Sequence, residues 1–423
     1  MTRRLHPAWS VAAVAFVALI GAAGFRSAPG VLIEPLQDEF GWSTATIGAA
    51  VSVNLVLFGL TAPFAAALME RFGIRKVTAF ALLMISLGSG LTVFMRQSWQ
   101  LIVCWGVLVG LGAGSMALAF VATVTSRWFV KHRGVVTGIL TAASATGQLI
   151  FLTFIASLTQ AQGWRIATLV ISATALLVVP LVLWRLRDDP ADLGVTALGA
   201  EAADGVPTGG SGGGAARRAL TALRDASRSG AFWLLVGGFA ICGMTTNGLI
   251  GTHFIPAAHD HGMPITTAAN LLALVGLFDI VGTVLSGWLT DRFDSRVLLG
   301  AYYLLRGLSL LILPGFFGAQ AHPSMLVFII FYGLDWVATV PPTIALCREQ
   351  FGVSGPIVFG WVFASHQIGA AVAAFGAGAV RDSLGSYNAA FYVAGALSVG
   401  AAGLSMAIRR PGTVRQWRVA LPA

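Results

Sequence analysis

Residues 59–76 read GLTAPFAAALMERFGIRK, and residues 280–297, which lie 221 positions later, read IVGTVLSGWLTDRFDSRV. In both stretches an apolar run ends in an acidic residue followed by arginine and phenylalanine. Because other residues match at the same offset, the chain is predicted to contain two copies of one structural unit. The matches pair Glu70 with Asp291, Arg71 with Arg292, Arg127 with Arg348, Gly134 with Gly355, Pro35 with Pro256 and Gly41 with Gly262.

The composition is typical of a protein embedded in a membrane. Of the 423 residues, 57% are hydrophobic and 10% are charged, whereas a soluble domain carries about 25% charged residues. A spanning helix needs roughly 20 apolar residues, and the apolar runs are too long for barrel strands. The first run lacks a cleavage-site pattern and is interpreted as a span, not a signal peptide. The runs predict twelve spans, over residues 9–32, 45–69, 77–95, 99–126, 134–159, 165–185, 231–257, 266–290, 297–319, 323–347, 356–380 and 386–408.

The expected fold is therefore all-α, with twelve transmembrane helices in two pseudo-symmetric six-helix bundles. Residues 186–230 contain DDPADLG and GVPTGGSGGGAARRA, whose Gly, Ser and Pro content predicts a flexible cytoplasmic linker. Residues 1–185 then form the N-terminal bundle and residues 231–423 the C-terminal bundle. A duplicated unit of this kind places a substrate site between the halves near mid-membrane, and rocking of the halves exposes it to each side in turn.

The net charge of +9 follows the predicted topology and does not indicate a nucleic-acid partner. With the N-terminus inside, most Lys and Arg residues collect on the cytoplasmic side, as the positive-inside rule requires. Both termini are then cytoplasmic, and the expected location is a bacterial-type cytoplasmic (inner) membrane. Away from the ends of the predicted spans, the only Lys or Arg residues at membrane depth are Arg26 and Arg306.

No metal or cofactor site is predicted. Cys104, Cys242 and Cys347 lack metal-ligand spacing. The segment THFIPAAHDHG (252–262) contains three histidines, but no further convergent ligand is visible, so we interpret it as a surface loop. The sequence also shows no nucleotide-binding motif and no pair of nucleophile and base. An enzyme is therefore not expected.

The segment AALMERFGIRK (66–76) resembles the loop motif of the major facilitator superfamily between spans 2 and 3. A weaker copy, GWLTDRFDSR (287–296), lies between spans 8 and 9, and the resemblance covers nearly the whole chain. In this family the acidic residue and its basic neighbours gate the cytoplasmic side. The alternative is a basic turn that only fixes the topology. The gate residues that the resemblance implies are Glu70, Arg71, Arg75, Asp291 and Arg292.

Within that superfamily the chain is similar to the monocarboxylate and oxalate–formate branch. The segments that carry the similarity are EFGWSTATI (39–47), RWFVKHRGVVTGI (127–139), GLFDIVG (276–282) and FASHQIGAA (363–371). The chain departs from the branch at Thr283, where an arginine is frequent, and at His366, where a lysine is frequent. The resemblance implies a secondary transporter that moves a small organic anion, a monocarboxylate, by alternating access. In this fold a single twelve-span unit, a monomer, suffices.

Arg26 is the first candidate for binding the substrate anion. It lies in span 1, beyond mid-membrane as counted from Trp9 at 1.5 Å per residue, and a guanidinium offers a planar fork of donors suited to a carboxylate. A structural ion pair and snorkelling to the outer headgroups are the alternatives. The repeat pairs Arg26 with Asn247. The other polar candidates for the substrate site are Asn54, Asn247, His366 and Gln367.

Asp279 in span 8 and His366 in span 11 are candidates for proton coupling, because ionisable groups at membrane depth are functional hypotheses by default. For Asp279 the alternative is a fixed ion pair with Arg306, and for His366 it is a packing role. A structural ion pair between Arg306 and Asp335 is favoured for those two residues.

Two other functions remain open at this stage. One is efflux of a drug or toxic anion, which two absences weaken: Trp105 stands where drug–proton antiporters of the superfamily usually carry an arginine, and TGILTAASATGQLIF (137–151) has no proline. The other is a non-transporting receptor built on a transporter scaffold.

Overall fold

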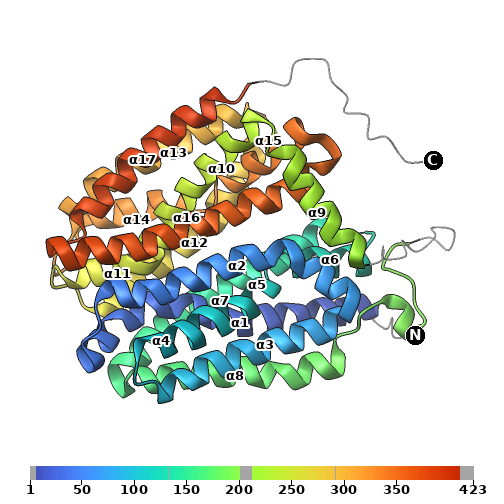
Figure 1. The fold of residues 1–423 in the computed structure, drawn as a ribbon, viewed down its shortest axis with the longest axis horizontal. Coiled ribbons are helices and arrows are strands. Elements are labelled where there is room, and N and C mark those ends of the chain that lie inside the picture. Colours follow the sequence, from blue (N-terminus) through green and yellow to red (C-terminus); the bar gives the residue numbers. More distant parts are fainter. Residues whose placement is uncertain (1–5, 132, 201–211, 291, 410–423) are drawn as a thin grey trace.

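The computed structural model describes residues 6–131, 133–200, 212–290 and 292–409. Within these ranges a few residues, among them Arg26 and Glu70, have only their backbone described. Long helices make up both halves of the molecule (Figure 1). The predicted fold of twelve spanning helices in two halves is confirmed.

The first half holds the six spans before residue 186. The fourth span is interrupted by the π-helical stretch η2 and by a turn after Ser115, and the other five are continuous helices. The elements are α1 (Pro7–Phe40), α2 (Thr44–Phe72), α3 (Ile74–Leu91), α4 (Ser98–Leu101), η2 (Ile102–Val109), α5 (Gly110–Ser115), α6 (Leu118–Trp128), α7 (Arg133–Gln162) and α8 (Trp164–Arg185).

The second half repeats this arrangement. Its first span contains the π-helical stretch η4, and its fourth span is broken into two helices. The elements are α10 (Gly230–Gly243), η4 (Met244–Ile250), α11 (Gly251–His259), α12 (Ile265–Thr290), α13 (Ser295–Ile312), α14 (Pro323–Asp335), α15 (Val340–Phe351), α16 (Gly355–Leu384) and α17 (Asn388–Ala407).

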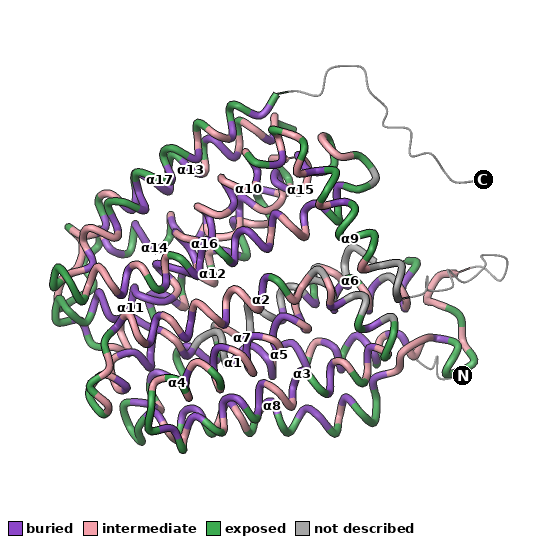
Figure 2. Tube along the Cα trace, in the orientation of Figure 1, coloured by how far each residue is buried: buried purple, intermediate pink, exposed green. Residues whose placement is uncertain are grey.

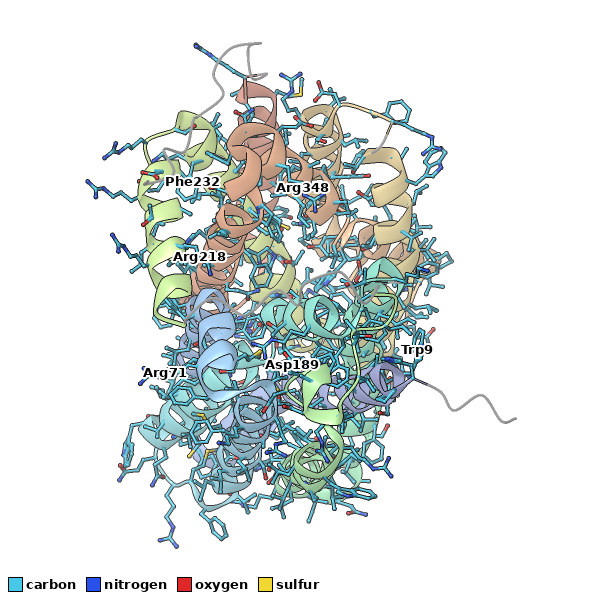
Figure 3. The ribbon with its side chains drawn as sticks, turned by 90° about the vertical axis from the view of Figure 1, so that its right-hand side faces the viewer. Trp9, Arg71, Asp189, Arg218, Phe232 and Arg348 are labelled. Atoms are coloured by element: carbon cyan, nitrogen blue, oxygen red, sulfur yellow. The ribbon has the colours of Figure 1, made fainter. Side chains whose placement is uncertain are left out.

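The two halves lie side by side, and the start of α1 and the end of α17 lie toward the same end of the bundle (Figure 1). We call this the terminal end and the opposite one the distal end. Figure 3 looks onto the terminal end and places Trp9, Arg71, Asp189, Arg218 and Arg348 there. An even number of spans per half returns the chain to the same end, so the inter-half connection also lies there.

Burial follows the pattern of a bundle in lipid. Buried residues face the inside of each half, and the exposed residues lie on its outer faces (Figure 2). Large apolar side chains are among the most exposed: Leu177 is 75% exposed, Val284 70% and Phe80 64%. Surfaces of this kind are stable only against hydrocarbon, because exposing large apolar side chains to water costs much free energy.

The inter-half segment differs from the expected flexible linker. A helix, α9 (Gly212–Ala226), lies within it and packs on α2 and α16. Ala219, Ala222 and Ala226 are buried, and the Trp361 Nε1 donates a hydrogen bond to the Ala219 carbonyl at 2.9 Å. The linker prediction was wrong for this stretch because a Gly/Ser run obscured the helical spacing of these alanines.

Glycine allows the helices of the second half to approach closely. A Cβ at Gly243 of α10 would lie 1.7 Å from the carbonyl oxygen of His366 on α16. That oxygen belongs to a helix backbone and cannot move aside locally, so the α10–α16 contact requires glycine at position 243.

We therefore expect Gly243→Ala to lower the free energy of unfolding by about 1–3 kcal/mol, the usual cost of overpacking. Gly400→Ala is the matched control, since a Cβ there meets nothing within 4 Å and alanine favours a helix. Thermal unfolding in detergent measures both variants. Equal melting temperatures for the two would contradict the close approach.

Candidate functional site

A cavity of about 50 Å³ lies between the two halves. Its walls come from α1, α2, η2 and α7 of the first half and from η4, α11 and α16 of the second. Four amide side chains face it, two from each half, among apolar groups. The lining residues are Pro29, Val51, Asn54, Leu55, Phe58, Trp105, Gln148, Asn247, Gly251, Thr252 and Gln367.

The amides differ in how firmly the protein holds them. The Asn54 Nδ2 donates a hydrogen bond to the Trp105 carbonyl at 2.8 Å. Gln367 is 1% exposed, and its Oε1 accepts no hydrogen bond from any residue that the structure describes. Asn247 lies within η4, where the π-helical turns are wider than those of an α-helix. Gln367 therefore has hydrogen-bonding capacity to offer a ligand.

A second cavity, of about 40 Å³, adjoins the first, because Gln148 and Gly251 line both. Asp279 and Trp336 also line it. Asp279 brings the one carboxylate among the residues that form the walls of the two cavities. Its Oδ1 accepts hydrogen bonds from the Thr283 hydroxyl at 2.9 Å and from the Val337 N–H at 3.0 Å.

Arg26 belongs to α1, but its side chain lies outside the described residues. Its backbone position lies one helical turn before Pro29, which lines the first cavity. Residues three apart share one face of a helix.

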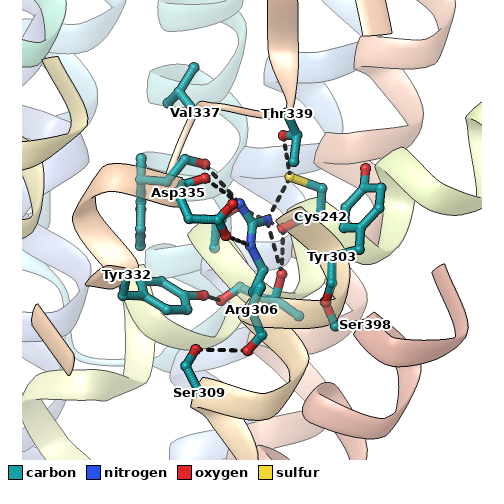
Figure 4. A network of polar contacts seen from close by, with 12 residues as sticks. Cys242, Tyr303, Arg306, Ser309, Tyr332, Asp335, Val337, Thr339 and Ser398 are labelled. Carbon is teal, nitrogen blue, oxygen red and sulfur yellow. Dashed lines mark hydrogen bonds and ion pairs between the residues drawn. The ribbon is translucent and has the colours of Figure 1, made fainter. Parts of the chain in front are cut away.

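Arg306 and Asp335, which the sequence analysis paired, are in contact within the second half (Figure 4). The Arg306 Nε donates to the Asp335 Oδ2 at 2.6 Å, and Nη1 donates to the Cys242 Sγ at 2.9 Å. The Arg306 side chain is 0% exposed. The alternative pairing of Arg306 with Asp279 is not the arrangement found, so the cavity carboxylate has no direct ion pair with this guanidinium.

His366 lies at the contact between α16 and α10 and is not among the residues that line the two cavities. Its ring centroid is 4.9 Å from that of Phe239 and 5.9 Å from that of Phe363. Its Nε2 lies 3.4 Å from the Thr246 hydroxyl. This position fits the packing alternative better than contact with a substrate.

The expected gate at the terminal end is described only in part. Asp291 and the side chain of Glu70 lie outside the described residues. Arg71 is exposed beside the Phe72 ring, and Arg292 lies over the Trp288 ring at 4.0 Å. The Arg75 N–H donates to the Asp188 Oδ1 at 2.7 Å.

Asp188 is a residue of this end that sequence reasoning missed. It follows α8 in the segment taken as linker, and its backbone carbonyl accepts a hydrogen bond from Arg127 at 3.3 Å. Asp188 thus ties the start of α3 to the ends of the fourth and sixth spans. Its place at the start of DDPADLG, just after an apolar run, was the available signal.

Polar contacts join the two halves at the distal end, and the sequence analysis did not foresee them. Asp382 of α16 accepts hydrogen bonds from the Thr44 N–H at 3.1 Å and the Ala45 N–H at 2.8 Å, at the start of α2. The Glu34 carboxylate lies 2.7 Å from the His259 Nε2. A carboxylate at a helix N-terminus is favoured by the free N–H groups and by the helix dipole. We call these two pairs the distal contact.

The histidine segment 252–262 is not a surface loop throughout. His253 lies within α11, is 0% exposed, and its Nε2 lies 2.8 Å from the Ala374 carbonyl. The loop prediction failed there because the helix continues to His259. Among the described residues, no group of three or more His, Cys, Asp or Glu side chains could hold a metal ion.

Comparison with known proteins gives concordant matches. The family described as Major Facilitator Superfamily matches residues 14–355 and 239–420. The relative named "Uncharacterized MFS-type transporter YcxA" from Bacillus subtilis is 25% identical over 90% of each chain. "Monocarboxylate transporter 13" from Rattus norvegicus is 27% identical over 94% of this chain and 87% of its own.

Solved structures match the fold over nearly the whole chain. A bacterial homolog to the human lysosomal transporter Spinster, in an inward-facing and unoccupied conformation, has a TM-score of 0.73 at 15% identity and covers 97% of this chain and 100% of its own. A D-xylose-proton symporter has a TM-score of 0.72 at 17% identity, with 95% and 97% covered. At these identities the likeness concerns the fold.

The distal contact generates a prediction. Asp382→Ala removes the acceptor of the Thr44 and Ala45 N–H groups and leaves the Ser43 cap of α2 in place; we expect a loss of about 1 kcal/mol, so the distal end should open more often. In a Ser52→Cys background, where residue 52 faces the Ala371 carbonyl across the halves, we expect a membrane-impermeant maleimide to react about fivefold faster. Asp38→Ala is the control, since Asp38 is an exposed carboxylate near the same end. An unchanged rate in Asp382→Ala would contradict the role of the Asp382 carboxylate.

Proposed function

The chain belongs to the Major Facilitator Superfamily, and its homologues are membrane transporters; from this premise we propose that it moves a small monocarboxylate across the membrane by alternating access. The terminal end, where Arg71, Arg218 and Arg348 lie, faces the cytoplasm in this proposal. The relatives named monocarboxylate transporters, which match nearly the full chain, support the substrate class.

The observation that carries the proposal is the first cavity. Gln148 from one half and Asn247 and Gln367 from the other converge on a space of about 50 Å³. Rocking of the halves would separate these groups, so a ligand held by both halves stabilises the closed arrangement that must form between the two open states. The small volume favours a ligand of few atoms.

The chemistry of the lining fits a short carboxylate. Each amide offers two N–H donors to a carboxylate oxygen, while Val51, Leu55 and Phe58 supply an apolar wall for a hydrocarbon tail. Arg26, one turn from the cavity on α1, is the proposed anchor for the negative charge, because a guanidinium binds a carboxylate through two parallel hydrogen bonds. Asn54, already bonded to Trp105, shapes the wall.

Asp279 is the proposed proton site. It is the carboxylate of the adjoining cavity, it is 8% exposed, and Gln148 connects it to the substrate cavity. Carrying a proton with the substrate anion makes the loaded transporter electrically neutral at this site, which lowers the cost of closing the halves around it. His366, packed between aromatic rings, is the less suitable proton carrier.

Uptake into proteoliposomes tests the function. We expect a radiolabelled short monocarboxylate to accumulate when the bath is acidic relative to the lumen, and neutral or cationic solutes of equal size to be excluded. The failure of every monocarboxylate alongside uptake of a neutral solute would contradict the substrate class. Binding of a carboxylate without flux would instead indicate a receptor.

The same assay tests Arg26. Arg26→Lys keeps the charge but loses the planar fork, so we expect the apparent KM for the carboxylate to rise about tenfold, and Arg26→Gln to raise it further. Arg96→Gln, an exposed arginine at the distal end, is the matched control and should leave KM unchanged. Normal KM values in folded Lys and Gln variants would exclude the contact.

A further inference from the structure

The fourth span of the second half breaks between Asp335 and Val340. The cause is in the sequence, where Pro341 and Pro342 follow. In an unbroken helix their N–H groups would bond to the carbonyls of Val337 and Ala338, but proline has no N–H. The segment Trp336–Thr339 therefore forms a turn in the interior of the second half, and its backbone groups need other partners.

Side chains of neighbouring helices bond to three carbonyls of the break, and the Val337 carbonyl accepts from the Val340 N–H within the turn. The Arg306 Nη2 of α13 donates to the Asp335 carbonyl at 2.6 Å and to the Trp336 carbonyl at 3.2 Å (Figure 4). The Ser286 hydroxyl of α12 donates to the Ala338 carbonyl at 2.5 Å. The Asp335 carboxylate compensates the charge of Arg306. This buried cation therefore acts as a hydrogen-bond donor to backbone carbonyls on the α14 side of the break.

A freed N–H group of the same turn bonds to a carboxylate. In a regular helix the Val337 N–H would bond to the Gly333 carbonyl, but here it donates to the Asp279 Oδ1. The Asp279 Oδ2 makes no hydrogen bond to a described residue. A hydrogen bond to a charged carboxylate is about twice as strong as one to a neutral group. The charge of Asp279 therefore affects how firmly the turn is held.

The position of Asp279 links this turn to the cavities. Asp279 and Trp336 both line the second cavity, beside Gln148 of the other half. The charged groups that act on Asp279 are Arg306 on α13 and Asp335 on α14. The described part of α7 presents the uncharged Gln148 and Leu152 to the same cavity. A proton or ligand that enters the cavity thus meets the group that bonds to the turn.

We propose that Asp279 is a positioning residue for the break in this span: its charged carboxylate restrains the turn at Val337, and binding of a proton loosens that restraint and frees α15 to move relative to α14. Arg306 keeps its bonds to the two carbonyls in both states and fixes the α14 side. Because α15 leads to the terminal end, its movement changes access there. This inference rests on the proposed proton coupling and names the structural element that responds to it.

The proposed step adds one proton to one carboxylate. A proton from the cavity binds to the Asp279 Oδ2, the carboxylate becomes a neutral acid, and no covalent bond within the chain breaks. The Oδ1 still accepts from Val337, but the bond is now one between neutral groups and is weaker. The change in bond strength corresponds to about a tenfold change in the population of the opened turn.

Hydrogen–deuterium exchange of the purified full chain measures this population directly. After correction for the intrinsic chemical rate at each pH, we expect protection of the peptide covering Trp336–Thr339 to fall about tenfold between about pH 8 and pH 5. Asp279→Asn imitates the protonated acid, so its protection should be low and independent of pH. Asp294→Asn, a carboxylate at the start of α13 that forms an ion pair with Arg296, should keep the wild-type response.

Thr283→Val supplies a second test that does not alter the carboxylate. It removes the other donor to the Asp279 Oδ1, and loss of a donor favours the protonated acid. The midpoint of the protection change should therefore move to higher pH. Protection that does not vary with pH in the wild type, an equal fall in Asp279→Asn, or an unshifted midpoint in Thr283→Val would each overturn the inference.

Failure of this inference can be told apart from failure of the proposed function. Exchange is measured without substrate, whereas the proposed function is measured as uptake. Monocarboxylate uptake with protection that is independent of pH would overturn only the role of Asp279 in the break. The expected protection changes without uptake of any monocarboxylate would support the role in the break and overturn the substrate proposal.

Discussion

The structure depends on one constraint: within hydrocarbon, polar groups and charges must find partners inside the bundle, because no water is available to them. A continuous helix meets this constraint by itself. The break after Asp335 does not, and Arg306, Ser286 and Asp279 compensate for it. The buried guanidinium thus bonds to two backbone carbonyls beside the break. Removing it would leave the Asp335 carboxylate without its ion-pair partner and the Trp336 carbonyl without its side-chain donor, which is strongly destabilising.

The same constraint helps to show which polar side chains in the cavities between the halves are available to bind a ligand. Some polar side chains form hydrogen bonds with the backbone, as the Asn54 amide does with the Trp105 carbonyl. Gln367, which is more deeply buried, has an oxygen with no partner among the described residues. This oxygen can accept only from a donor group, whereas the amide N–H groups that line the cavity can donate to a carboxylate. The four amides that converge on the first cavity from both halves are therefore the indication of a site for a polar ligand.

The sequence predicted the spans and the two halves well, because span length and apolar content are local properties. It also paired Arg306 with Asp335, since both are charges at membrane depth on helices adjacent in sequence. It did not foresee the role of Asp382, whose partners are backbone N–H groups 337 and 338 positions away. Nearly every residue has a backbone N–H group, so the amino-acid types do not show which residues will donate to a carboxylate in this way. Helix α9 was missed for a different reason: the helical spacing of its buried alanines follows directly after a glycine run.

The central claim is that Asp279 links proton binding to movement of the transporter. Transport by Asp279→Asn in proteoliposomes tests it most directly, with accumulation against a gradient and exchange across the membrane measured in one preparation. The account predicts that proton-driven accumulation of the monocarboxylate disappears while exchange of internal for external substrate continues, because the halves still move when the site is permanently neutral. Accumulation at the wild-type level in Asp279→Asn would contradict it.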